Sequence, residues 1–336
     1  MRIDLGTAPI ERITCLYIGR IGDVVVATPF LRALRKRFPK ARIRLIAGYR
    51  AVQVLPLIPF VDEKVVLGRP GQLGAHLTLA LSLLREPCDL LVDLNSSFSK
   101  TSTFLARAAR ARVSLAFEKG KGPRVFNRTI PAPEEREHMA HRYERLAEAV
   151  GGTYGPDLEL RVSPQDDARA GELLAPLLAA DSRSFRVLVH PGNITRPPAF
   201  WPADRLTELC RRLQDDPSLR LYFLAGPGEL ETVRSIAAAL PRPAPILPAA
   251  PLPVVAGMVK RMNLLVGSLT STTHIAAALG VPTFAFYEGY TQAVWRPRGA
   301  RNGGTVSTQW SGVGPTTVEQ ASSALKEHIS RLCPRI

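Results

Sequence analysis

The chain has 336 residues, of which 46% are hydrophobic and 22% charged, and its formal net charge is +15. This length allows two domains with well-buried cores, and the composition is that of a globular protein. No apolar run is long enough to span a bilayer, and the N-terminus lacks the apolar core of a secretory signal, so we expect a cytoplasmic protein.

The positive charge indicates an acidic partner, which could be phosphates on a small molecule, an anionic lipid surface or nucleic acid. A charge that serves only solubility is the alternative. Nucleic acid ranks last, because we find no basic reading motif and no aromatic platforms for single strands. The four cysteines are scattered without metal-ligand spacing, and we interpret them as reduced thiols.

The first elements in chain order predict a parallel sheet. Residues 12–18 form a strand candidate, Gly19 to Asp23 a turn, residues 24–38 a helix, and residues 43–47 the next strand. The turn lacks the G-x-G-x-x-G fingerprint, so a dinucleotide site is poorly supported. Asp23 follows the carboxyl end of the first strand, where open α/β sheets place their ligands. It is either a general base for a substrate hydroxyl or simply a helix cap.

The rest of the first half alternates in the same way, with strands at 61–67 and 89–94 around a helix at 74–85. Lys100 opens a helix after a strand end, where it could meet an anion. Residues 118–128 combine glycine, proline and basic side chains and predict a mobile basic loop, although a solvated charged face is the alternative. His138 and Arg142 lie near the start of a helix at 134–150. No further metal-type ligands accompany its histidines, so we predict no metal site.

A second alternating series follows a boundary that we place between residues 160 and 183. The predicted strands are 185–190, 219–225, 245–247, 263–266 and 283–287, and the predicted helices are 166–180, 202–214, 229–240, 254–260, 272–279 and 316–332. Two such series predict two doubly wound domains. In the loop at 190–202, Thr195 and Arg196 could hold phosphate oxygens. Glu229 either caps a helix or accepts from ribose hydroxyls.

Residues 262–280 read as a strand, a small-residue turn and a helix that ends at Gly280. Thr270 or Ser271 can cap this helix, because a hydroxyl satisfies free N–H groups of the first turn. The positive end of a helix is a ready place for a phosphate. An ordinary capped crossover is the alternative.

Six motifs in order resemble the bacterial lipopolysaccharide heptosyltransferases, glycosyltransferase family 9, over nearly the full length. They are residues 18–25 with Thr28-Pro29, 93–100, 190–202, 225–229, 266–280, and 281–297. The resemblance implies an α/β protein of GT-B fold, with two Rossmann-like doubly wound domains facing across a cleft. It implies an N-terminal acceptor-binding domain over 1–165 and a C-terminal nucleotide-sugar-binding domain over 166–315. The helix at 316–336 would return to the N-terminal domain.

The resemblance also implies an inverting, metal-independent enzyme that transfers a sugar, a heptose or a relative, from a nucleotide diphosphate donor of the ADP-heptose type. The nucleotide-sugar is a co-substrate, and no separate cofactor is expected. The acceptor would be an acidic saccharide or a lipid-linked one. If the acceptor is a lipid, the basic loop at 118–128 and the helix at 24–38 indicate peripheral contact with the anionic inner face of the plasma membrane. Asp23 falls on the family's proposed base. The resemblance matches Thr195, Thr270 and Ser271 to the diphosphate, Glu229 to the nucleoside, and Lys100, His138 and Arg142 to the acceptor side. Arg196 and His274 are further donor-binding candidates, and Lys119, Lys121 and Arg124 of the basic loop are further acceptor-binding candidates.

The sequence departs from the family at two positions of the donor side. The family's donor-binding Asp is Leu269 here, and its phosphate-binding Lys is Ala199, with Arg196 three residues earlier as a possible replacement. A leucine cannot accept a hydrogen bond from a sugar hydroxyl. These changes leave the donor sugar open. They also keep alive a second hypothesis, that of a catalytically weakened protein that binds a nucleotide-sugar or an anionic glycolipid on the same fold.

Overall fold

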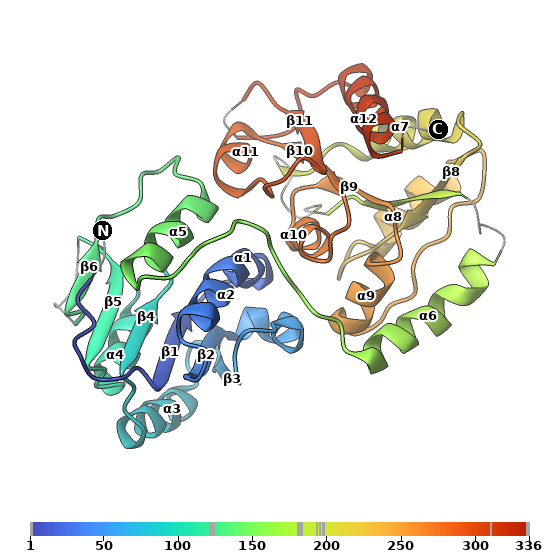
Figure 1. Cartoon of the computed structure of the whole chain (residues 1–336). Helices are drawn as coiled ribbons and strands as arrows, with labels where there is room; N and C mark the ends of the chain where they lie inside the picture. The colour runs from blue at the N-terminus through green and yellow to red at the C-terminus, as the bar shows by residue number, and fades with distance from the viewer. Residues whose placement is uncertain are drawn as a thin grey trace. The chain divides into compact units, whose positions relative to one another are not determined.

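The protein folds as two compact α/β units, Met1–Glu159 and Leu160–Ile336, as the computed structural model shows (Figure 1). The structure describes residues 3–120, 125–179, 184–192, 194, 196, 199–309 and 311–333. The change of unit falls just before the predicted boundary at 165/166. It precedes α6, Pro164–Leu178, which packs against α9 of the second unit.

Unit 1 is built on a six-stranded parallel sheet in the order β3-β2-β1-β4-β5-β6. The strands are β1 Arg12–Tyr17, β2 Arg42–Gly48, β3 Glu63–Leu67, β4 Leu90–Asp93, β5 Val113–Phe117 and β6 Arg128–Ile130. The helices are α1 Ile21–Val26, α2 Thr28–Arg37, the 3-10 helix η1 Tyr49–Leu57, α3 Leu73–Arg85, α4 Lys100–Ala108 and α5 Met139–Ala149. Helices α3 and α4 share one apolar cluster on one face of the sheet, while α2 packs against α5 (Figure 1).

The single helix predicted over 24–38 is two helices, α1 and α2, which meet at Ala27. Pro29 has no N–H to donate to the carbonyl of Val25, its partner one helical turn earlier. The hydroxyl of Thr28 donates to that carbonyl instead, at 2.7 Å. The break shortens α1 to six residues and keeps Asp23 in its first turn.

Unit 2 is built on a five-stranded parallel sheet in the order β11-β10-β9-β7-β8. The strands are β7 Phe185–His190, β8 Leu219–Phe223, β9 Leu264–Ser268, β10 Thr283–Tyr287 and β11 Asn302–Val306. The further helices are α7 Ala203–Gln214, α8 Leu230–Ala238, α9 Leu252–Val259, α10 Ser271–Ala278, α11 Gly289–Trp295 and α12 Val318–Leu332. The strand predicted at 245–247 is reduced to a single bridge between Phe223 and Ile246.

The core of unit 2 has two apolar layers, one on each face of its sheet. Alternate residues of a strand point to opposite faces, so Val187 and Val189 of β7 pack with α7, α8 and α12, whereas Leu188 packs with α6, α9 and α10. This three-layer arrangement is that of a doubly wound domain.

The last helix, α12, for which the resemblance implies a return to the N-terminal domain, packs on the sheet of unit 2. Ala321, Leu325 and Ile329 of α12 are buried in the apolar cluster of unit 2, and the helix packs against α7 and β11. These side chains recur every three to four residues and form one apolar face. Because that face is covered within unit 2, α12 belongs to this unit.

Candidate functional site

Each sheet has one topological switch point, where neighbouring strands lead into connections on opposite sides. In unit 1 it lies between β1 and β4, because β1 pairs with both β2 and β4. In unit 2 it lies between β7 and β9, because β7 pairs with both β8 and β9. Ligands of open α/β sheets bind outside the carboxyl ends of such strands. Functional side chains are therefore expected beyond the carboxyl ends of the strands at these two switch points.

Asp23 lies beyond β1 in the first turn of α1, as predicted. The backbone N–H of Arg20 donates to Asp23 Oδ2 at 2.6 Å, and no described residue hydrogen-bonds Oδ1. The two predicted roles are therefore compatible, because one oxygen caps the helix while the other has no hydrogen-bond partner among the described residues. Burial raises the pKa of Asp23 above its ordinary value, although the N–H and the charge of Arg20 act the other way.

The turn before Asp23 requires glycine. A Cβ on Gly19 would lie 2.8 Å from both Cβ and Oδ2 of Asp23, which is closer than such atoms approach. Any larger residue at Gly19 would displace the carboxylate, so the Gly19-to-Asp23 spacing fixes where that carboxylate lies.

Two tyrosines lie close to Asp23 in the core of unit 1. The hydroxyl of Tyr143 donates to that of Tyr17 at 2.7 Å, and both side chains are buried. Burial raises the pKa of each phenol, and the negative charge of Asp23 adds to the rise. Both phenols therefore stay protonated at neutral pH, which leaves Asp23 as the group of this trio that can accept a proton.

The end of β4 carries a second acid, Asp93, whose charge is already paired. Lys119 Nζ contacts Asp93 Oδ2 at 2.5 Å, with side-chain exposures of 6% and 0%. Asn95 donates to Asp93 Oδ1 through its backbone N–H at 3.0 Å and its side-chain amide at 2.6 Å. The prediction of a mobile basic loop is thus wrong for Lys119, because its cation is buried in an ion pair within unit 1. Lys121 and Arg124 lie outside the described residues.

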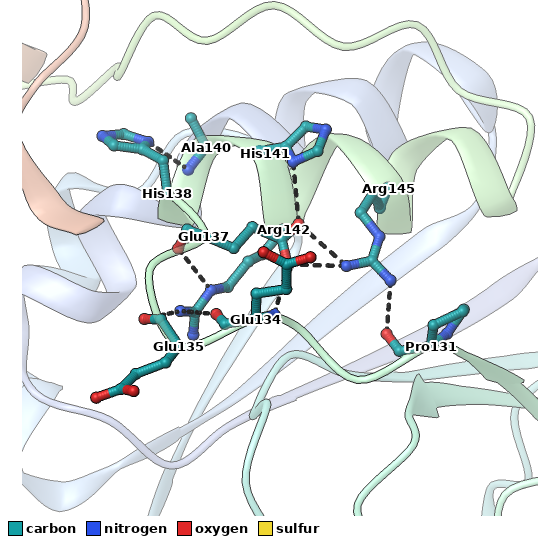
Figure 2. Close-up of polar contacts among 9 residues, drawn as sticks. All are labelled: Pro131, Glu134, Glu135, Glu137, His138, Ala140, His141, Arg142 and Arg145. Atoms are coloured by element: carbon teal, nitrogen blue, oxygen red, sulfur yellow. Dashed lines mark hydrogen bonds and ion pairs between the residues drawn. The ribbon is translucent and has the colours of Figure 1, made fainter. Parts of the chain in front are cut away.

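Arg142 and His138 hold the segment that leads into α5 (Figure 2). The buried guanidinium of Arg142 donates to the carbonyl oxygens of Glu137 at 3.0 Å, Glu134 at 3.1 Å and Glu135 at 3.4 Å. His138 is the N-cap of α5, and its Nδ1 accepts from the N–H of Ala140 at 3.1 Å. Arg142 therefore shapes this segment from inside, where sequence reasoning placed it against an acceptor.

The carboxylate of Glu137 contacts two basic side chains of α5. Arg145 donates to both of its oxygens, at 3.0 and 2.9 Å, and His141 Nδ1 lies 3.0 Å from Oε1 (Figure 2). Lys100 has a different setting. It is exposed at the first residue of α4, and no described carboxylate pairs with it. Of the acceptor-side residues that the structure describes, Lys100 is the cation best placed to meet an anion.

His190 joins two of the predicted donor-side residues in unit 2. Its Nε2 lies 3.0 Å from Oε2 of Glu229, and its Nδ1 lies 3.4 Å from the hydroxyl of Thr270. The N–H of Gly226 also donates to Glu229 Oε2, at 2.7 Å. Burial alone would raise the pKa of Glu229, but these hydrogen bonds and the histidine charge hold it below its ordinary value. The carboxylate is ionised, so Nε2 of His190 donates.

The helix α10 begins as the sequence predicts. Thr270 is its N-cap, and its hydroxyl accepts from the N–H of Thr272 at 3.3 Å. Gly192 makes this approach possible, because its φ is +58° and a Cβ there would lie 2.6 Å from Thr270 Cγ2. Ser271 is the first residue of α10 and is half-buried. A hydroxyl cap at the positive end of α10 thus lies at the switch point of unit 2.

Of the remaining donor-side residues, the structure describes His274 and Arg196. His274 is buried within unit 2, with its ring centroid 6.4 Å from that of Trp295. Arg196 is exposed, and Thr195 lies outside the described residues. Sequence reasoning did not select His190. The available signal was its position as the last residue of a strand whose neighbours at the switch point carry Glu229 and Thr270.

The described residues contain neither a metal-ligand cluster nor a membrane-spanning helix. No group of three or more histidine, cysteine, aspartate or glutamate side chains there could hold a metal ion. None of the helices that the structure describes is both long and apolar enough to cross a membrane.

These features define an α/β protein of the Rossmann type. Each of its two units has a candidate ligand site at the carboxyl ends of the strands at its switch point. Residues 77–322 match the model of glycosyltransferase family 9 (heptosyltransferase), so the chain belongs to this family and is a glycosyltransferase. The comparison with curated protein sequences gave no significant match.

Solved structures show the same GT-B fold over nearly the whole chain. A family 9 glycosyltransferase from Veillonella parvula is 20% identical, with a TM-score of 0.84 over 96% of this chain and 97% of that one. The E. coli ADP-heptose lipopolysaccharide heptosyltransferase II is 19% identical, with a TM-score of 0.77 over 96% and 99%. The E. coli heptosyltransferase WaaC with ADP is 18% identical, with a TM-score of 0.73 over 96% and 100%.

Proposed function

We propose that the protein transfers a sugar from a nucleotide diphosphate donor to an acidic acceptor with inversion and without a metal, and that Asp23 is the base. The observation that carries this proposal is the setting of Asp23 at the switch point of unit 1. One carboxylate oxygen accepts from the N–H of the turn, the other has no hydrogen-bond partner among the described residues, and burial raises the pKa of Asp23 above its ordinary value. In the reaction Asp23 Oδ1 takes the proton of the acceptor's hydroxyl group while the oxygen of that hydroxyl group attacks the anomeric carbon. The bond to the diphosphate breaks on the opposite face.

The donor in this proposal is a nucleotide diphosphate-sugar of the ADP-heptose type, bound by unit 2. Thr270 and Ser271 at the start of α10 would face the diphosphate, with the helix dipole in place of a metal. Glu229 would accept from the nucleoside, and His190 would hold both Glu229 and Thr270. Supporting this choice, the E. coli heptosyltransferase WaaC was solved once with ADP and once with ADP-2-deoxy-2-fluoro heptose. Leu269, which replaces an acidic position of the family, leaves the sugar itself open.

The acceptor in this proposal is an acidic saccharide, free or linked to a lipid, bound by unit 1. Lys100 is its first contact, since it is an exposed cation near the carboxyl edge of the sheet. The net charge of +15 favours such an acceptor and a cytoplasmic enzyme that works at an anionic membrane surface.

The test is nucleotide release. We expect ADP to appear when the protein is mixed with ADP-heptose and a lipopolysaccharide core acceptor, with or without a chelator, and the new glycosidic bond to have inverted configuration by NMR. Retention of configuration, or release that a chelator abolishes, would contradict the inverting and metal-free parts separately. Binding of nucleotide-sugars without any release would favour the alternative, a catalytically weakened binding protein, which Leu269 and Ala199 motivate.

Replacement of His190 should weaken donor binding more than it weakens folding. In His190→Ala, Glu229 and Thr270 lose their common partner, and a hydrogen bond to a charged group contributes about 1.5–3 kcal/mol. We expect the affinity for ADP, measured by calorimetry, to fall roughly tenfold or more. His76→Ala in unit 1 is the control, and its ADP affinity should equal that of the unchanged protein. A His190→Ala variant with unaltered ADP affinity contradicts this role.

A further inference from the structure

Helix α3 exposes a stripe of leucines. Leu73, Leu77, Leu81 and Leu84 are 77%, 56%, 42% and 40% exposed, and at ~100° per residue they fall within roughly 80° of the helix circumference. The helix is anchored by another part of its surface, where Ala80 and Leu83 are buried against the sheet. The stripe is thus not the face that holds α3 in the fold.

Exposed apolar side chains are concentrated in and around this helix. In the described part of the chain, six of the ten exposed large hydrophobic side chains lie between residues 73 and 104. The six are Leu73, Leu77, Leu81, Leu84, Phe98 and Phe104. Scattered exposed leucines are ordinary, but a concentration of this kind marks an interaction surface.

Helix α4, which packs beside α3, adds cations to the same side of the sheet (Figure 1). Lys100, Phe104 and Arg107 are exposed at the spacing of one helical face, and Arg85 is exposed at the end of α3. No described carboxylate pairs with Lys100, Arg107 or Arg85. Each of the three acids in residues 64–112 has a partner. Glu86 pairs with Arg44, Asp93 pairs with Lys119, and Asp89 accepts from the N–H groups of Glu11 and Arg12.

We propose that the leucine stripe of α3 and the basic face of α4 form a docking surface for an anionic lipid bilayer. Leucines in a stripe enter the acyl boundary of a bilayer, and flanking cations are attracted to acidic headgroups. The absence of unpaired acids in residues 64–112 favours a negatively charged partner. It disfavours a second copy of this chain, which would bring the same cations to the contact.

The surface lies where an acceptor would be needed. The amino ends of α3 and α4 follow the carboxyl ends of β3 and β4, so Leu73 and Lys100 lie at the sheet edge that also carries Asp23. Docking through α3 would hold that edge near the headgroups. The link between this surface and the acceptor rests on the proposed function, whereas docking to a bilayer does not.

The test is partition of the full chain onto vesicles at physiological ionic strength, with no donor or acceptor present. We expect binding to vesicles of phosphatidylcholine mixed with phosphatidylglycerol, and weak binding to phosphatidylcholine alone. Leu77→Gln with Leu81→Gln should lower the partition about tenfold or more, because two apolar side chains no longer enter the membrane. Arg85→Gln with Arg107→Gln should lower it about fivefold for each cation removed.

Matched controls lie on α8 of unit 2, where Leu230 is 40% exposed and Arg234 forms an ion pair with Glu231. Leu230→Gln and Arg234→Gln should bind vesicles like the unchanged protein. Circular dichroism and unfolding midpoints check that each variant is folded. Equal binding by the α3 variant and the unchanged protein overturns the proposal. So does an α3 variant that only converts a self-associated form to a monomer. Vesicle binding without sugar transfer would refute the proposed function and leave this surface intact.

Discussion

Replacing Asp23 by asparagine should lower the rate of sugar transfer by about 10²–10⁴-fold, which is the usual contribution of a positioned general base. Asparagine has nearly the same shape, and its amide oxygen can still accept from the N–H of Arg20, so the turn should persist. What the variant lacks is a group that takes a proton. The unchanged enzyme should lose activity on acidification at a higher pH than an ordinary carboxyl would give, since burial raises the pKa of Asp23. The residual activity of the variant should lack that limb.

The same substitution should stabilise the fold at neutral pH. Because the pKa of Asp23 is higher in the folded chain than in the unfolded one, the folded chain binds the extra proton between these two values. Stability therefore falls as pH rises through that window and stays lowered above it. Removing the buried charge should raise the midpoint of thermal unfolding at pH 7 while activity is lost.

Asp62 provides the control of opposite sign. It accepts from the N–H of Ile43 at 2.7 Å and from Arg35 at 2.5 Å, and these partners outweigh burial and lower its pKa. Its contribution to stability is present above the unfolded pKa and is lost as pH falls through the folded one. Asp62→Asn should therefore lower the unfolding midpoint and leave transfer unchanged. A base role for Asp23 fails if Asp23→Asn retains the full rate.

The features that could be predicted from the sequence are those set by neighbours along the chain. Alternating apolar runs and turns predicted most of the strands, and β7 and β10 have their predicted bounds. The hydroxyl cap at Thr270 was predictable, because an N-cap acts on residues two or three positions later. The break at Ala27 was missed, although Pro29 announces it. The short strands β6 and β11 carry too few apolar residues to stand out.

The features that could not be predicted depend on partners far apart in the sequence. Glu229 and His190 are 39 residues apart, and their hydrogen bond exists only because β7 and β8 are adjacent. Arg142 read as a surface cation on a helix, yet its guanidinium is consumed by carbonyl oxygens of the preceding turn. The local sequence pattern predicts which side chains lie near the ends of strands. Contacts between distant segments decide whether the charge of such a side chain is available to a ligand.

Lys119 is the sharpest case of a charge spent inside the fold, and its replacement should destabilise unit 1 by about 3–5 kcal/mol. In Lys119→Met the carboxylate of Asp93, which is fully buried, would keep only the hydrogen bonds from Asn95. A buried charge without its counter-ion is far more unfavourable than the intact pair. The measurement is urea unfolding of the full chain with and without ADP. The loss of stability should appear in the unfolding transition of unit 1, which ADP bound to unit 2 does not shift.

Two further variants separate structure from acceptor binding. Lys119→Met combined with Asp93→Asn should recover much of the lost stability, because the remaining amide is uncharged and still accepts from Asn95. Lys100→Met should change stability by no more than ~0.5 kcal/mol, since its exposed side chain pairs with no described acid. It should raise the KM for an acidic acceptor instead. Unchanged stability of Lys119→Met together with a raised KM for the acceptor would contradict this structural role. Lys119 would then be a residue that contacts the acceptor.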